Sequence, residues 1–323
     1  MMSSVNIRHL KIAVTSFTFS NNPLLLKRVR KHPFAELVLN TTTYLPGQKE
    51  LLTYLQGKDG AIIGREIVND SVLGNCPGLK VLSKFGVGVD NIDFDACRRH
   101  GVEVVYSTGV NKRSVAEQTL AFMIFLERNL HRAHIQLKGG IWNKAGGRQL
   151  SGKTVGIIGV GNIGKEVVHL LHPFGCRILV NDIIDLSAYY RRMGLIEAGK
   201  EQIFREADIV TIHTPLTPKT RHMVNRTVLK EMKKEAFLIN TARGPIVKQD
   251  DLKWALERGI IAGAALDVFE KEPPTDIDFL KLDNMICTPH IGGHSHEGLV
   301  AMGEHAVDNL LAFFKHRDKA GGR

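Results

Sequence analysis

Three residues in the last third of the chain, Arg243, Glu272 and His290, have side chains suited to the reduction of a carbonyl group. Each follows an apolar run typical of a buried strand, and open α/β sheets bind ligands at the carboxyl ends of their strands. A guanidinium can hold a carboxylate with two hydrogen bonds. A carboxylate beside an imidazole favours the protonated ring, which can deliver a proton near neutral pH. An arginine, glutamate or histidine alone is more often a surface ion pair, a loop residue or a core group. It is the occurrence of all three after neighbouring strands that indicates carbonyl reduction.

A glycine-rich segment in the middle of the chain predicts a dinucleotide site beside these residues. Gly159, Gly161 and Gly164 form G-x-G-x-x-G between an apolar run and a helical pattern. Gly159 permits a sharp turn, Gly161 lets a pyrophosphate approach the backbone, and Gly164 lets the helix pack closely on the strand. The first N–H groups and the dipole of that helix attract phosphate. The alternative is a tight structural turn, which is the commoner meaning of such glycines alone.

Asp182 narrows the expected dinucleotide to NAD. It ends the next apolar run, and an acid about 20 residues after the glycines typically accepts hydrogen bonds from the adenosine ribose hydroxyls. The same carboxylate would repel the 2′-phosphate of NADP. Strand, glycines, helix and acid in this order favour NAD binding over a structural turn.

Short apolar runs alternate with helical patterns along the chain, which is typical of parallel sheets covered by helices on both faces. Five candidate strands lie before the glycine motif, and six lie from the motif onward. We therefore expect an α/β protein with two doubly wound parallel-sheet domains. The candidate strands are 11–16, 36–39, 61–64, 80–85, 103–107, 155–159, 178–182, 209–213, 237–240, 264–268 and 285–288.

The segment 114–138 connects the two series of strands and contains no proline or glycine. It predicts one long, heavily buried helix, because residues 120–126 are apolar nearly all round. Such a helix lies in a core or at a subunit contact, and the pattern alone favours the core. A second helical pattern covers 295–314.

The composition is that of a water-soluble globular protein: 323 residues, 43% hydrophobic and 24% charged, with no apolar run long enough for a membrane span. Four widely spaced cysteines and an N-terminus without a signal-peptide pattern predict a reducing, cytoplasmic location. The formal charge of +10 leaves nucleic acid as one alternative partner. The basic residues are scattered, however, which favours solvated faces and small anions over nucleic acid.

From about residue 60 to 309 the sequence resembles the D-isomer-specific 2-hydroxyacid dehydrogenase family, close to its phosphoglycerate dehydrogenase-like branch. The matching motifs, in order, are KFGVGVDNID (84–93), GVN (109–111), SVAE (114–117), GKT (152–154) before the glycines, HTPLT (213–217), TRH (220–222), NTARG (240–244), DVFE (267–270), EP (272–273) and PHIGG (289–293).

The resemblance implies a domain organisation and a partner. The substrate-binding domain would be flavodoxin-like and split into 1–109 and 292–323. An NAD-binding Rossmann domain, 110–291, would be inserted between its halves, and the cleft between the domains would close on substrate. The resemblance also implies a homodimer through the 114–138 region, a small 2-oxo or 2-hydroxy acid as substrate, and neither a nucleic-acid nor a membrane partner.

The resemblance also implies the roles of individual residues. Arg243 would bind the substrate carboxylate and carbonyl, Glu272 and His290 would form the acid/base pair, and Val87 and Gly88 would offer backbone N–H groups to the carboxylate. The implied NAD contacts are Gly159, Gly161, Asn162, Ile163, Gly164, Asp182, His213, Thr214, Pro215, Thr220, Thr241, Ala242, Arg243, Asp267, His290 and Gly292.

Two basic residues, Arg65 and Lys84, bear on whether the substrate carries a phosphate, but they do not decide it. Arg65 lies one place later than the arginine with which phosphoglycerate dehydrogenases usually grip phosphate, and Lys84 stands where a basic residue is also common. We expect both to bind substrate, which could be 3-phosphoglycerate or the pair glyoxylate and hydroxypyruvate. We also expect no C-terminal regulatory domain, and hence no feedback control by serine through such a domain.

Three alternatives remain open. The chain could be an NAD-sensing, co-repressor-like protein, since such relatives retain Arg243, Glu272 and His290. It could be a dehydrogenase of the same fold that oxidises formate or phosphite, although the Val87–Gly88 loop is of the hydroxyacid type. The spacing of His290, His294 and His296 could suggest a metal site. Because the family's chemistry uses no metal and no acidic co-ligand is evident, we expect none, and His294 could instead contact substrate.

Overall fold

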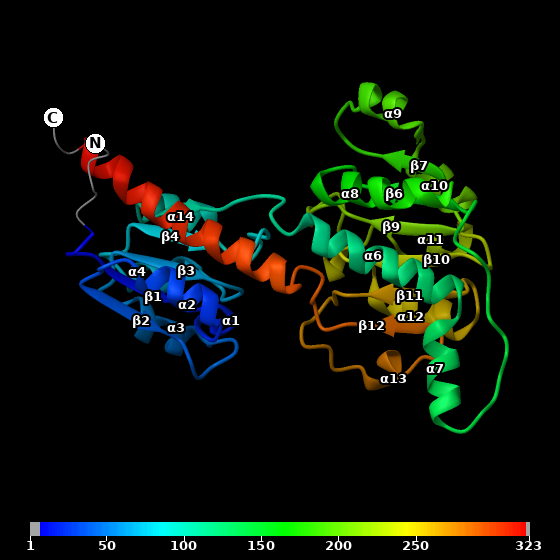
Figure 1. Cartoon of the computed structure of the whole chain (residues 1–323), viewed down its shortest axis with the longest axis horizontal. Coiled ribbons are helices and arrows are strands. Elements are labelled where there is room, and N and C mark those ends of the chain that lie inside the picture. The colour runs from blue at the N-terminus through cyan, green and yellow to red at the C-terminus, as the bar shows by residue number, and fades with distance from the viewer. Residues whose placement is uncertain (1–6, 321–323) are drawn as a thin grey trace. The chain divides into compact units, whose positions relative to one another are not determined.

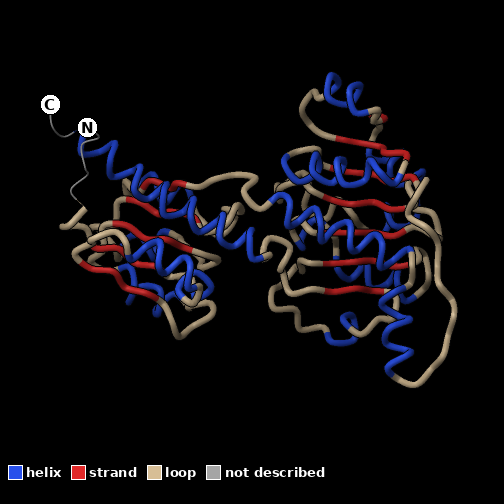
Figure 2. The backbone as a smooth tube through the Cα atoms, in the orientation of Figure 1, coloured by secondary structure: helices blue, strands red, loops and turns tan. Residues whose placement is uncertain are grey.

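The computed structural model describes residues 7–320, so the ends of the predicted first and last segments, 1–6 and 321–323, lie outside it. The chain forms two compact units (Figures 1 and 2). One contains the residues up to Asn111 together with the segment from His296, and the other spans Lys112–Ser295.

The first unit is built on a five-stranded parallel sheet in the order β2-β1-β3-β4-β5. This is the strand order of flavodoxin-like folds. The strands are β1 (Lys11–Val14), β2 (Glu36–Leu39), β3 (Gly60–Ile63), β4 (Val81–Lys84) and β5 (Glu103–Val105). The helices are α1 (Phe17–Ser20), α2 (Pro23–Arg30), α3 (Gln48–Leu55), α4 (Asp70–Gly74), α5 (Phe94–Arg99) and α14 (His296–Ala320).

Two apolar clusters cover opposite faces of this sheet, because its central strands bury apolar side chains on both faces. One cluster joins Ile12 and Val14 to α2 and α14, and the other joins Ala13 to α3, α4 and α5. Helix α14, drawn orange to red in Figure 1, packs on the sheet formed by the first part of the chain.

The second unit contains a seven-stranded parallel sheet in the order β12-β11-β10-β9-β6-β7-β8. The strands are β6 (Thr154–Ile158), β7 (Arg177–Asn181), β8 (Ile196–Glu197), β9 (Ile209–Ile212), β10 (Phe237–Asn240), β11 (Gly263–Leu266) and β12 (Met285–Cys287). The helices are α6 (Lys112–Glu127), α7 (Leu130–Lys138), α8 (Asn162–Leu171), α9 (Ser187–Met193), α10 (Lys200–Glu206), α11 (Arg226–Glu231), α12 (Gln249–Glu257) and α13 (Ile277–Leu280), with 3₁₀ turns η1 (His172–Phe174) and η2 (Gly244–Ile246).

This order makes the second unit a Rossmann fold with one added strand, and it fixes where a ligand can bind. Strand β6 pairs with β7 on one side and with β9 on the other. The chain thus proceeds outward from β6 in opposite directions, and the carboxyl ends of the strands at such a switch point form a crevice.

The predicted fold class is confirmed, and each of the eleven predicted strands corresponds to a strand of the structure. Strand β8 is additional, because its two exposed residues carry no periodic signal.

The prediction of one buried helix over 114–138 is wrong in two respects. The helix is interrupted between α6 and α7, where Asn129 adopts a left-handed conformation (φ 52°) that asparagine tolerates better than most residues. Its amide donates to Ala145 O at 3.1 Å. Helix α7 also contains no buried residue. Local hydrogen bonding at Asn129 therefore overrides the helical pattern.

Candidate active site

The glycine turn lies between β6 and α8, at the switch point of the second sheet. Gly159 has φ +97°, and a Cβ there would lie 2.7 Å from the carbonyl group of His213. A Cβ on Gly164 would collide with the carbonyl oxygen of Gly159. A Cβ on Gly161, by contrast, would meet nothing within 4 Å. Two of the glycines thus serve packing, and Gly161 keeps the start of α8, with Asn162 and Ile163, open to a ligand.

Asp182, directly after β7, is bound to the same turn. One carboxylate oxygen accepts a hydrogen bond from Val160 N at 2.6 Å, and the other accepts from Ile183 N at 2.7 Å and Ile184 N at 3.2 Å. Side chains of Ile183 and Ile184 are exposed. The acid is therefore held at the carboxyl edge, directly beside the glycine turn.

The loop after β9 forms the side of the crevice that faces the glycine turn. His213 Nε2 lies 3.0 Å from Thr211 Oγ1, whereas His213 Nδ1 and Thr214 Oγ1 are buried polar atoms without a hydrogen-bond partner. Burial lowers the pKa of His213 to about 3, so the ring is neutral under ordinary conditions. Thr220 shapes this loop, because its hydroxyl donates to Pro215 O at 2.8 Å.

These features fit a dinucleotide. The open backbone at Gly161 leaves room for a pyrophosphate at the start of α8. Unpartnered polar atoms on His213 and Thr214 offer hydrogen bonds that a bound ligand can take up.

Arg243 follows β10 on a loop held by Asn240. The amide of Asn240 donates to Arg243 O at 2.9 Å, and its oxygen accepts from Ala242 N at 3.0 Å. The Arg243 guanidinium is half-buried and donates to Ala242 O at 2.7 Å. Thr241 is buried beneath the loop. Neighbouring turns of backbone thus fix the arginine at the carboxyl edge.

His290 and Glu272 are brought together from the loops after β12 and β11. His290 Nδ1 lies 2.8 Å from Glu272 Oε2, and Glu272 Oε1 accepts from Phe269 N at 3.2 Å. Side chains of His290 and Glu272 are 33% and 19% exposed, so the pair is reachable from solvent yet partly desolvated. A Cβ on Gly244 would collide with the Phe269 carbonyl group, so the loop of Arg243 packs directly against the loop of Glu272.

Asp267 anchors the loop that carries His290. Its carboxylate is buried and accepts hydrogen bonds from Thr288 Oγ1 at 2.5 Å, Ile291 N at 2.9 Å and Gly292 N at 2.8 Å. His290 itself has φ +55°, in the left-handed region that residues with a Cβ rarely adopt. The surrounding bonds are therefore what holds the imidazole in place.

The other predicted substrate residues belong to the first unit, at the carboxyl ends of β3 and β4. Val87 and Gly88 are half-buried and Arg65 is exposed. Lys84 is buried, and its ammonium donates to Gly64 O and, at 2.8 Å, to Asn91 Oδ1. Nearby Glu66 is also buried, and burial raises the pKa of its carboxyl against the opposing effect of the Lys84 charge. The ammonium of Lys84 thus braces the loops that carry Arg65 and Val87.

Within residues 7–320 there is no group of three or more histidine, cysteine or acidic side chains placed to hold a metal ion. His294, half-buried, donates its backbone N–H to Ile291 O at 2.8 Å, and His296 begins α14. None of the helices in the described part of the chain is both long and apolar enough to cross a membrane.

Several residues that organise the site have no role predicted from the sequence. Asn240, Thr288 and Gln118 each bond a loop of the site, and Gln118 does so from α6. Asn240 and Thr288 carry a usable signal, since each is a polar residue at the carboxyl end of an apolar strand. Gln118 carries none, because its partner is 170 residues away.

A Rossmann sheet with a glycine turn, an acid after the next strand and a His–Glu pair beside an arginine define the class of NAD-binding, dehydrogenase-type α/β proteins. The chain belongs to the D-isomer-specific 2-hydroxyacid dehydrogenase family, whose NAD-binding domain matches residues 120–292, more than half of its length.

Individual relatives agree with this assignment. D-3-phosphoglycerate dehydrogenase of Methanocaldococcus jannaschii is 40% identical over 268 residues, 81% of this chain and 51% of that protein. Glyoxylate reductase of Thermofilum pendens is 37% identical over 281 residues, 84% of this chain and 82% of that protein. A crystal structure of a Thermus thermophilus protein superposes with a TM-score of 0.85 at 33% identity, covering 95% of this chain and 97% of that one. The chain spans about half the length of the phosphoglycerate dehydrogenases of M. jannaschii and Bacillus subtilis.

Proposed function

We propose that the protein is an NAD-dependent oxidoreductase that interconverts a 2-oxo acid and a D-2-hydroxy acid. The observation that carries the proposal is the 2.8 Å contact between His290 Nδ1 and Glu272 Oε2. This pair lies at the carboxyl edge of the sheet whose switch point bears the glycine turn, and its loop packs against the loop of Arg243.

His290 is the proposed acid. With Nδ1 held by Glu272, Nε2 is the nitrogen available to a substrate oxygen. The protonated ring can give its proton to the carbonyl oxygen as the alcohol forms, and the neutral ring can take it back in the oxidative direction. Bound NADH supplies the hydride for the carbonyl carbon, so that a 2-oxo acid, NADH and one proton give the 2-hydroxy acid and NAD⁺.

Arg243 is the proposed substrate clamp. Its guanidinium can hold the substrate carboxylate and polarise the adjacent carbonyl. From the first unit we propose that Val87 and Gly88 offer backbone N–H groups to the carboxylate and that Arg65 contacts the remainder of the substrate. For Lys84 we propose support of these loops through Gly64 and Asn91, because its ammonium is buried and committed to them.

NAD is proposed to bind along the carboxyl edge of the second sheet. The glycine turn and the start of α8 would hold the pyrophosphate, Asp182 the adenosine ribose, and the loop after β9 the adenosine side. The loops after β10, β11 and β12 would line the nicotinamide half. The proposed contacts are Gly159, Gly161, Asn162, Ile163, Gly164, Asp182, His213, Thr214, Pro215, Thr220, Thr241, Ala242, Arg243, Asp267, His290 and Gly292.

The test is NADH oxidation against a panel of 2-oxo acids. The relatives are named for glyoxylate, hydroxypyruvate and D-3-phosphoglycerate, so the panel begins with glyoxylate, hydroxypyruvate and 3-phosphohydroxypyruvate, the 2-oxo acid that corresponds to 3-phosphoglycerate. Pyruvate and larger branched or aromatic analogues extend the range. Turnover of at least one compound supports the proposal, and its response to Arg65→Ala separates phosphorylated from unphosphorylated substrates. Tight NADH binding with no turnover on the whole panel would contradict it and favour an NAD-sensing protein. Oxidation of formate or phosphite alone would favour the other alternative.

We further propose a homodimer formed through the 114–138 region. Helix α7 buries none of its residues, and Ile135 and Leu137 are 55% and 57% exposed, with Phe125 of α6 43% exposed. Exposed apolar side chains gathered on one segment are typical of a subunit contact. The expected result is a particle of twice the chain mass in analytical ultracentrifugation, shifted toward the monomer by Leu137→Glu; a monomer in the parent would contradict the proposal.

A cytoplasmic location is also proposed. All four cysteines are free thiols, and burial raises the pKa of Cys97 and Cys287 to about 11. Free, unreactive thiols are typical of a reducing compartment.

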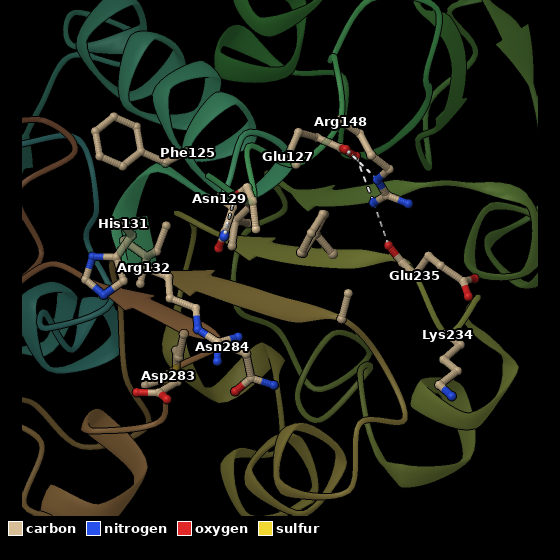
Figure 3. A pocket seen from close by; sticks show the side chains of 17 residues that line it. Phe125, Glu127, Asn129, His131, Arg132, Arg148, Lys234, Glu235, Asp283 and Asn284 are labelled. Atoms are coloured by element: carbon tan, nitrogen blue, oxygen red, sulfur yellow. Dashed lines mark hydrogen bonds and ion pairs between the residues drawn. The ribbon is translucent and has the colours of Figure 1, made fainter. Parts of the chain in front are cut away.

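The second unit, Lys112–Ser295, also contains a cavity of about 480 Å³ at the amino ends of its strands, opposite the edge that carries the candidate site (Figure 3). Residues near the α6–α7 junction, among them Phe125 and Arg132, line it together with residues that precede β10 and β12, such as Glu235 and Asn284. Arg148 crosses its wall, pairing with the buried Glu127 at 2.9 Å and donating to Glu235 O. We assign this cavity no part in the reaction, since it lies at the amino ends of the strands.

A further inference from the structure

Helix α6 reaches the loops of the candidate site through three polar side chains on its inner face. The first is Ser114, whose hydroxyl donates to Gly292 O at 2.6 Å and accepts from Ser295 N at 3.2 Å. A single hydroxyl therefore ties both ends of the segment that follows His290. These partners lie about 180 residues further along the chain.

Gln118, one helical turn later, holds the other side of His290. Its amide donates to Thr288 Oγ1 at 2.8 Å, and the Thr288 hydroxyl donates in turn to Asp267 Oδ1 at 2.5 Å. The Asp267 carboxylate also accepts from Ile291 N. Because a threonine hydroxyl has one proton, the bond from Gln118 directs the proton of Thr288 toward Asp267. The chain of bonds thus runs from α6 to residues on both sides of His290.

Thr119 makes the equivalent contact to the loop of Arg243. Its hydroxyl donates to Val115 O at 2.8 Å and lies 3.1 Å from Thr241 Oγ1. Since the one proton of Thr119 is already directed to Val115, the Thr241 hydroxyl is the donor in this buried pair. Thr241 is two residues before Arg243, so the same helix also fixes the base of the arginine loop.

We propose that Ser114 and Gln118 are positioning residues for His290, and that Thr119 has the same role for Arg243. The inference rests on the proposed function. Ser114 and Gln118 bond the loop that carries His290, through the Gly292 carbonyl oxygen and the Thr288 hydroxyl. His290 needs such support, because its left-handed backbone (φ +55°) is not one that a histidine adopts readily by itself. Helix α6 thereby sets the direction in which the imidazole presents Nε2.

The test compares Ser114→Ala and Gln118→Met, which remove the bonds and keep most of the volume, with Ser114→Thr, which restores the hydroxyl. Loss of one such bond lowers kcat by about tenfold if it is expressed in the reacting geometry. The NADH dissociation constant stays at the parent value, while the pH profile of kcat changes because the His290–Glu272 contact loosens. The matched control is Glu117→Gln, an exposed residue of the same helix whose nearest cation, Arg113, is 4.0 Å away.

A second measurement separates this inference from the proposed function. The imidazole of His290 is followed by NMR titration in the parent, in Gln118→Met and in Glu117→Gln, which needs no substrate. A changed titration midpoint in Gln118→Met alone supports positioning even if no 2-oxo acid is turned over. Unchanged kcat, pH profile and titration in Ser114→Ala and Gln118→Met, with thermal unfolding as in the parent, would overturn it. An inactive parent with the expected NMR shift would instead count against the proposed function alone.

Discussion

The Nδ1 atom of His290 lies 2.8 Å from Oε2 of Glu272, although the two residues follow different strands of the sheet. Loops after β11 and β12 are adjacent because those strands pair in parallel, so their carboxyl ends meet at one edge. The contact orients the imidazole and leaves Nε2 for substrate.

Glu272→Gln should preserve this contact and remove its charge. Because a neutral amide cannot offset the positive charge of the imidazolium that donates the proton, we expect kcat for reduction to fall by roughly tenfold to a hundredfold at neutral pH. Turnover of the best 2-oxo acid by Glu272→Gln and by the parent measures the effect. Equal kcat values would show that the carboxylate does not act on the proton carried by His290.

The glycine turn offers a matched pair of variants. Gly164→Ala places a Cβ against the carbonyl oxygen of Gly159, so it should lower the melting temperature as well as NADH affinity. Gly161→Ala has open space around it and should melt like the parent, yet it should weaken NADH binding by about tenfold or more by crowding the pyrophosphate. Thermal unfolding and fluorescence titration with NADH distinguish the two. Parent-like affinity in Gly161→Ala would argue against the assigned pyrophosphate site.

His213 should make the fold sensitive to acid. Its folded pKa is about 3, whereas the unfolded ring titrates near 6.5. As the pH falls below the unfolded value, only the unfolded state gains a proton, so stability present above pH 6.5 is lost. Between about pH 7 and 5 this loss is about 2 kcal/mol. His213→Gln should remove that part of the slope in urea denaturation. Equal slopes in parent and variant would mean that His213 is protonated in the folded state.

Lys84 should matter more for stability than its half-buried neighbour Lys80. Lys84→Met leaves the buried Glu66 carboxylate without its cation, which costs about 3–5 kcal/mol of unfolding free energy. Lys80 forms a partly exposed pair with Asp59 at 2.7 Å, so Lys80→Met should cost less than about 1 kcal/mol. Adding Glu66→Gln to Lys84→Met should restore part of the loss. Equal effects of the two lysine variants in urea denaturation would contradict a stabilising role of the buried Lys84 ammonium.

The sequence predicts those parts of the fold that depend on local pattern. The run 209–212 is recognisable as a strand because all four of its residues are buried in the sheet. The glycine motif is recognisable as a turn because a Cβ on Gly159 or Gly164 would collide with backbone, while Gly161 leaves open space for a ligand. The break at Asn129 is not predictable in this way. It depends on a hydrogen bond to Ala145, 16 residues away, that a helical pattern does not reveal.

The residues of the candidate site also differ in whether local sequence pattern predicts them. Arg243, Glu272 and His290 are recognisable from residue type and position after a strand. The burial of Lys84 and the contacts of Ser114 and Gln118 are not, since each of these residues has a partner at least 20 residues away in the sequence. Such bonds are fixed only when the sheet and its helices have assembled.

The most direct test of His290 as the acid is turnover by His290→Ala beside the parent, with the best 2-oxo acid of the panel and with NADH affinity measured on the same samples. Loss of a positioned general acid typically costs about 10²–10⁴ in rate. We expect a fall of that size with NADH affinity unchanged, and a comparable fall for Arg243→Ala. Retained turnover in both variants, with NADH bound as in the parent, would contradict it.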